Sequence, residues 1–179
     1  MLGLFRRDDP VKSAANRLQA AIAARAHAPV FYTRFAVADN IDGRFDLFTL
    51  HACVVLQALK DAGGDPALGQ HLANEIFASF EEALRDLGVT DAGLSRRIKA
   101  MANAFYGRLA AYDTAKSGQE LAEVLTRNLY RGQPHDLEAQ ALAHYMQAMR
   151  QRLRNQNLAT GEIDFGSLPE LVNQSVASS

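Results

Sequence analysis

Apolar residues recur at helical spacing along nearly the whole chain, and no segment alternates convincingly between apolar and polar positions. Residues three and four apart share one face of a helix, whereas a half-buried strand needs a period of two. This pattern predicts an all-α fold. The chain has 179 residues, of which 48% are hydrophobic, so it fits one domain with a packed core.

Glycine, proline and capping residues divide the pattern into about six predicted helices. They run from Pro10 to about Ala26, from about Asp42 to Gly63, from Pro66 to Gly88, from about Asp91 to Ala115, from Ser117 to Gly132, and from Asp136 onward. The predicted N-terminal caps include Asp42, Asp65, Ser117 and Asp136. Ser117 and Glu120 also have the spacing of a capping box.

The remaining segments connect or flank these helices. Residues 30–41 are expected to form an extended connector whose apolar side chains lie across the core, namely Phe31, Tyr32, Phe35 and Val37. We expect a helical domain over residues 10–160, with a flexible segment at 1–9 and a partly ordered, Ser-rich tail at 161–179.

The helix near 91–115 has two faces that can pack. One carries larger apolar residues, namely Ile98, Met101, Phe105, Leu109 and Tyr112, and the other carries Ala100, Ala104, Gly107 and Ala111. Because small residues let another backbone approach closely, we predict that this helix is the central one of a bundle. The core is expected to include Phe48, Leu56, Phe77, Phe80, Phe105 and Leu109.

Several classes of function lack the residues they need. A net charge of −1 argues against a nucleic-acid binder, and the five histidines and one cysteine show no metal-ligand spacing. We therefore expect no DNA, metal or cofactor. Cys53 is two positions from His51, so on a helix the two side chains do not face each other, and Cys53 is predicted to be a half-buried small hydrophobe.

The chain start bears on location. It lacks the apolar stretch of a secretory signal, and no apolar run is long enough to span a membrane, so we expect a cytoplasmic protein. The residues before the first helix combine apolar and basic side chains that are suited to a weak contact with an anionic membrane, namely Leu2, Leu4, Phe5, Arg6 and Arg7.

Polar residues flank the apolar stripes of two helices. Arg44 and His51 share a helical edge with Phe48, and Lys99, Tyr106 and Arg108 border the stripe of the 91–115 helix. Two interpretations stay open. These side chains are boundary residues satisfied within the chain, or they form a polar surface for a partner. Similarly, the acidic third and basic fourth helices either pair with each other or leave a basic face free.

Three blocks resemble the ubiquinol–cytochrome c chaperone family: DGRFDL followed by LH in DNIDGRFDLFTLH, LxxLGVxD in LRDLGVTD, and KxMxxAFYGRxxxY in RRIKAMANAFYGRLAAY. The likeness runs from about Phe31 to Tyr112. It implies an all-helical accessory protein without a cofactor that helps to assemble the respiratory complex carrying electrons from ubiquinol to cytochrome c. The chain looks like a bacterial member, at or near the inner face of the cytoplasmic membrane.

The resemblance implies a client, which is newly made cytochrome b or another subunit of that complex. The expected partner-binding residues are Arg44, Asp46, His51, Lys99, Tyr106, Arg108 and Tyr112. The alternative is a small ligand-binding protein or enzyme with a pocket near Arg44, His51, Tyr106 and Tyr112. A pocket on which those four converge would favour the alternative, and an exposed apolar patch beside basic residues would favour the chaperone. The sequence leaves the oligomeric state open.

Overall fold

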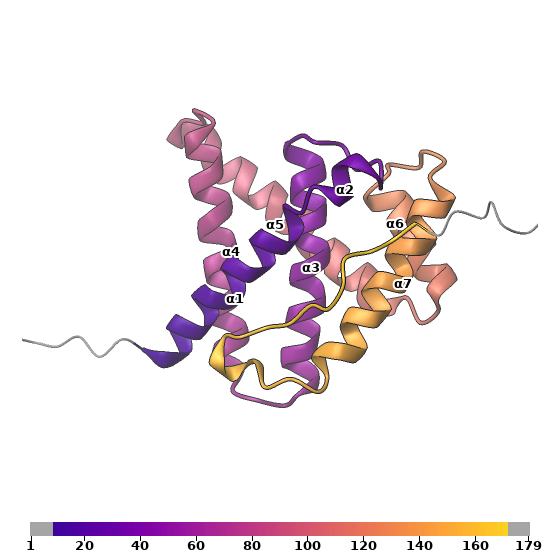
Figure 1. Cartoon of the computed structure of the whole chain (residues 1–179). Helices are drawn as coiled ribbons and strands as arrows, with labels where there is room; N and C mark the ends of the chain where they lie inside the picture. The colour runs from indigo at the N-terminus through magenta and orange to yellow at the C-terminus, as the bar shows by residue number, and fades with distance from the viewer. Residues whose placement is uncertain (1–8, 172–179) are drawn as a thin grey trace, which may run out of the picture.

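The computed structural model describes residues 9–171, and every regular element among them is helical (Figure 1). The elements are α1 (Pro10–Ala26), α2 (Val30–Thr33), α3 (Ile41–Asp61), α4 (Pro66–Asp86), α5 (Asp91–Thr114), α6 (Gly118–Asn128), α7 (Asp136–Leu153) and the 3-10 turn η1 (Leu158–Thr160). The predicted all-α single domain is confirmed, and the six predicted helices correspond to α1 and to α3–α7. The short helix α2 lies within the segment predicted to be an extended connector.

Residues 1–8 and 172–179 lie outside the described part of the chain. The predicted membrane-contact residues, Leu2, Leu4, Phe5, Arg6 and Arg7, are all among them.

Local capping chemistry sets most of the helix starts. The Asp65 carboxylate accepts a hydrogen bond from the Ala67 amide at 2.9 Å, with Pro66 in the first turn. Ser117 and Glu120 form the predicted capping box at the start of α6. These caps satisfy amide groups that no helical carbonyl can reach.

Two predicted caps are displaced. Asn40, not Asp42, caps α3, because its side chain accepts from the Gly43 amide at 2.9 Å. Asp136 is the first residue of α7 and His135 precedes it in the capping position. In both cases the acidic residue lies in the first turn, where its charge favours a helix start without capping it.

The most enclosed helix is α3. It packs against α1, α4, α5 and α7 and stands near the middle of the view in Figure 1. Twelve of its residues are buried, whereas α5 buries only Leu94, Phe105 and Tyr112. The prediction that the 91–115 helix is central was therefore wrong. A side chain at Gly107 would meet no heavy atom within 4 Å, so nothing in the described chain approaches the small-residue face of α5 there.

The predicted core residues all belong to one hydrophobic cluster. Phe48, Phe80 and Phe105 are buried, and the others, Leu56, Phe77 and Leu109, pack against them while keeping some exposure. Phe48 meets Phe80 edge-on with ring centroids 5.3 Å apart, and Phe77 meets Phe105 in the same way at 5.5 Å. Edge-to-face contact adds stability beyond the burial of area. Cys53 is more buried than predicted, at 2% exposure.

Residues 161–171, the first part of the predicted tail, form a segment that we call the strap. In Figure 1 the strap follows η1 and crosses the molecule between α1 and α7. Gly161 starts it with a φ of 78°, and a side chain there would come within 2.7 Å of the backbone of Ala14 in α1. Only glycine fits that approach without strain.

Candidate functional site

The first and third sequence blocks meet between α3 and α5 through one carboxylate. The Asp46 side chain is fully buried, with one oxygen 2.7 Å from the Arg108 guanidinium and the other 3.1 Å from that of Arg131. Burial outweighs the two arginines and raises the pKa of Asp46 to about 6. Removing one partner of such a pair leaves an uncompensated buried charge, so Asp46 and Arg108 fix α5 against α3.

Arg131 belongs to this cluster although the sequence analysis missed it. Its guanidinium also lies 3.5 Å from Asp42, and its backbone has a φ of 53°, which is unusual for a residue with a side chain. The only sequence signal was the Arg131–Gly132 pair after α6, which suggests a turn but not the partner that the side chain reaches.

Arg108 makes a second contact with the first block. Its guanidinium lies 5.3 Å from the ring centroid of Phe45, and its side chain keeps only 15% exposure. The boundary interpretation therefore describes Arg108 well, because its charge is satisfied inside the chain.

His51 is held inside the molecule by a directional chain of hydrogen bonds. Its Nδ1 lies 2.7 Å from the Leu47 carbonyl, which can only accept, so Nδ1 carries the proton. The Nε2 atom then accepts from the Tyr145 hydroxyl at 2.9 Å, and that oxygen accepts from Arg25 at 2.7 Å. Burial lowers the pKa of His51 to about 4, which keeps the ring neutral.

Tyr112 is also inside, at 1% exposure. Arg150 donates to its main-chain carbonyl at 2.7 Å, while its hydroxyl has no hydrogen-bond partner among residues 9–171. Burial raises the pKa of the Tyr112 hydroxyl. The structure thus corrects the prediction for Asp46, His51 and Tyr112: their side chains face the interior and present nothing to a partner.

Arg44 lies on a different side of α3. It is exposed, forms an ion pair with Asp39 at 2.8 Å, and lines a cleft that includes Tyr32 of α2. Because Tyr106 is 51% exposed while His51 and Tyr112 are buried, these residues do not converge with Arg44 on a pocket. The arrangement that would have favoured a ligand-binding protein or enzyme does not form in the described part of the chain.

The middle block, LxxLGVxD, builds the turn between α4 and α5. Gly88 has a φ of 78°, and the Val89 amide returns to the Leu84 carbonyl at 3.0 Å, which closes the end of α4. Asp91 pairs with Arg85 at 2.8 Å. The basic partner in these ion pairs is Arg85 of α4, which binds Glu81 of α4 and Asp91 of α5. Within residues 9–171, no acidic residue of α4 forms an ion pair with a basic residue of α5.

The side of α5 that points away from α3 remains uncovered. We call it the α5 face, and it consists of exposed residues at helical spacing: Arg96, Lys99, Ala100, Asn103, Tyr106, Gly107 and Ala110. No carboxylate within residues 9–171 forms an ion pair with Arg96 or Lys99. Of the predicted partner-binding residues, the structure places Lys99 and Tyr106 together on this face.

Tyr106 projects from an aromatic group that begins in the core. Its ring centroid lies 5.5 Å from that of the fully buried Phe105 and 5.8 Å from that of Phe77. Packing against these two rings therefore holds the Tyr106 side chain in place, while about half of the residue stays exposed. Beside it, Gly107 leaves space for the backbone of another molecule.

The described helices carry neither a metal cluster nor a membrane span. Within residues 9–171 there is no group of three His, Cys, Asp or Glu side chains placed to hold an ion. None of the helices in this part of the chain combines the length and the apolar character needed to cross a bilayer.

Comparison with known proteins shows which family this chain resembles in sequence and structure. A family model for the ubiquinol-cytochrome C chaperone matches residues 33–161. The ubiquinol-cytochrome-c reductase complex assembly factor 1 of Xenopus laevis is 24% identical over 174 residues, covering 93% of this chain and 87% of that protein. The crystal structure of the Cbp3 homolog from Brucella abortus is 34% identical, with a TM-score of 0.79 and coverage of 92% and 95%. The chain belongs to the ubiquinol–cytochrome c chaperone family.

Proposed function

We propose that this chain is an assembly chaperone for ubiquinol–cytochrome c reductase, and that its α5 face binds the newly made cytochrome b subunit. Membership of the family and the name of the Xenopus laevis relative support the role in assembly. The α5 face supports the proposed binding site, because it exposes Tyr106, Gly107 and basic side chains that form no ion pair within residues 9–171. The role is one of binding and involves no reaction of its own.

A transmembrane helix is a client that suits this face. Helices of membrane proteins pack through small residues that let two backbones come close, and Ala100, Gly107 and Ala110 offer matching small positions. Tyrosine is enriched where protein, lipid headgroups and water meet, which suits Tyr106. A client helix would pack on these small residues, with Tyr106 at its edge.

The bases suggest where binding takes place. Arg96, Arg97 and Lys99 are exposed near the start of α5, and anionic headgroups attract such side chains. We propose that binding occurs at the inner face of the cytoplasmic membrane, with residues 1–7 as a second contact. Deleting residues 1–7 should weaken sedimentation with anionic liposomes at low salt, and high salt should weaken it further. Equal sedimentation of the truncated and complete chains would remove this second contact.

Site-specific crosslinking in cells tests the client proposal. A photo-reactive amino acid replaces Asn103, which is exposed in the middle of the α5 face, and a control chain carries it at the exposed Gln151 of α7. We expect position 103 to crosslink to cytochrome b during its synthesis and position 151 not to. Crosslinking to cytochrome b from position 151 alone, or from neither position in cells that assemble the complex normally, would contradict the proposal.

A further inference from the structure

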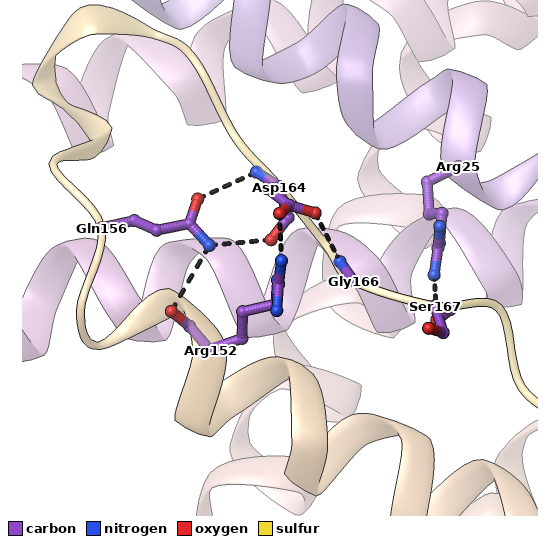
Figure 2. A network of polar contacts seen from close by, with 6 residues as sticks. All are labelled: Arg25, Arg152, Gln156, Asp164, Gly166 and Ser167. Atoms are coloured by element: carbon purple, nitrogen blue, oxygen red, sulfur yellow. Dashed lines mark hydrogen bonds and ion pairs between the residues drawn. The ribbon is translucent and has the colours of Figure 1, made fainter.

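The strap is held in part through its main chain. Gln156, just after α7, donates to the Asp164 carbonyl and accepts from the Asp164 amide, both at 2.8 Å (Figure 2). Arg25 of α1 donates to the Ser167 carbonyl from the other side. Contacts of this kind recognise an extended backbone whatever its side chains are, as when a peptide is bound by main-chain hydrogen bonds.

Three consecutive strap residues make contacts that depend on their side chains or on the lack of one. The Asp164 carboxylate pairs with Arg152 of α7, as Figure 2 shows. Phe165 is 8% exposed, and its ring lies 5.9 Å from that of His51. Gly166 has a φ of 79°, and a side chain there would come within 3.0 Å of Arg152. The contacts of the strap with α3 and α7 thus involve an acidic residue, an aromatic residue and a glycine in that order.

The residues around the Phe165 ring are held in place by polar contacts with one another. The Arg25 guanidinium lies 5.8 Å from the Phe165 ring centroid and 5.4 Å from that of Tyr145. The Tyr145 hydroxyl is in turn fixed by His51. His51 thus contacts the Phe165 ring directly and also positions the Tyr145 side chain beside Arg25.

The strap does not fill the space available to it. A cleft of about 790 Å³ stays open between the strap and the outer side of α7. Leu137 of α7 and Leu168 of the strap both line it, and they are 60% and 41% exposed. A ligand longer or bulkier than the strap would find further apolar contacts there.

We propose that the groove between α1 and α7 is a binding site for an extended segment of a partner protein, with an acidic–aromatic–glycine sequence, and that the strap is its intramolecular occupant. The strap competes at the high effective concentration that a short tether gives, of the order of millimolar. A partner therefore binds weakly while the strap is seated and more tightly once it is loosened. This site is separate from the α5 face and does not depend on the identity of the client.

A labelled peptide with the sequence of residues 159–171 tests the groove by fluorescence anisotropy. The complete chain is compared with the complete chain carrying Phe165→Ala, which removes the strap's aromatic anchor. We expect the variant to bind the peptide about tenfold or more tightly than the unchanged chain, because its own strap competes less well. A peptide in which the same phenylalanine is alanine should not bind.

Two further variants keep this test decisive. Asp164→Ala, a surface change that breaks the pair with Arg152, loosens the strap without opening a cavity and should give the same result if Phe165→Ala fails to fold. Adding Gln156→Ala should abolish peptide binding, whereas Gln151→Ala, an exposed residue on α7, should leave it unchanged.

Other results would overturn the proposal. The groove is not a peptide site if folded, strap-loosened chains do not bind the peptide, or if they bind the phenylalanine and alanine peptides equally. If the unchanged chain forms a dimer that the peptide dissociates, the occupant is the strap of a second copy, not a segment of a different partner.

Discussion

At the scale of single residues, the same side-chain types play opposite roles according to what covers them. Arg108 and Lys99 both border the apolar stripe of α5, yet Arg108 is satisfied by a buried carboxylate while Lys99 is exposed. Helical spacing shows which residues share an edge, but it does not show which neighbouring helix covers that edge. For this reason the spacing predicts one role for Lys99 and Arg108 together with Asp46, His51 and Tyr112, whereas the structure separates them.

The Asp46 carboxyl leads to a prediction about pH. Its pKa is about 6 in the folded chain, against about 3.9 in an unfolded one, so the folded state holds this proton more tightly. The stabilisation from protonation is complete below the unfolded pKa and is lost as the pH rises through 6. Relative to Asp46→Asn, the unchanged chain should lose on the order of 2 kcal/mol of unfolding free energy between pH 4.5 and 7.5.

Urea unfolding of the two proteins across that pH range measures this difference. Because both share every other titratable group, those contributions cancel in the comparison. A difference that stays constant with pH, or that grows in favour of the unchanged chain, would show that Arg108 and Arg131 outweigh burial at this site.

At the scale of helices, local chemistry was predictable and helix position was not. Asp65 with Pro66, and Ser117 with Glu120, fix helix starts through contacts between near neighbours in the sequence. Which helix is central depends on how the helices pack. The alanines of α5 predicted a second packed face on that helix, and the structure leaves this face exposed. Alanine favours a helix on any surface, so a face rich in alanine does not require a covering element.

Two glycines allow a matched test of this distinction. A side chain at Gly43 would lie 2.0 Å from the Ala38 carbonyl oxygen, whereas one at Gly107 meets nothing within 4 Å. Gly107→Ala should raise the unfolding free energy by about 0.5–1 kcal/mol, because alanine is the better helix former. Gly43→Ala should lower it by about 1–3 kcal/mol through overpacking. Thermal and urea unfolding of the two variants measure both effects, and destabilisation by Gly107→Ala would mean that its face is covered after all.

For the chain as a whole, the fold class followed from the period of the apolar residues, and the helices other than α2 followed from the glycine, proline and capping residues between them. The path of the strap did not follow, because its contacts join residues far apart in the sequence, such as Arg25 with Ser167. No local pattern encodes such a pairing. Of the candidate site, the sequence identified Lys99 and Tyr106, and only the structure showed that α5 leaves them exposed side by side with Gly107.

We expect the α5 face to act on a client and to contribute little to the stability of the chain. This is tested by the amount of assembled reductase in cells that carry Lys99→Ala with Tyr106→Ser, measured beside the melting temperature and cellular level of the variant. Ile41→Ser is the matched control, since Ile41 at the start of α3 is 54% exposed and Tyr106 is 51% exposed.

We expect the double variant to melt only slightly below the unchanged chain, because it loses the contacts of Tyr106 with Phe105 and Phe77 at the surface. Its abundance should stay normal while the cells assemble less reductase, and the control should assemble a normal amount. Arg108→Ala should instead lower the melting temperature and the level of the chain, because it leaves the Asp46 charge without its closest partner. Normal assembly of the reductase with a stable, abundant double variant would show that the α5 face does not act on a client.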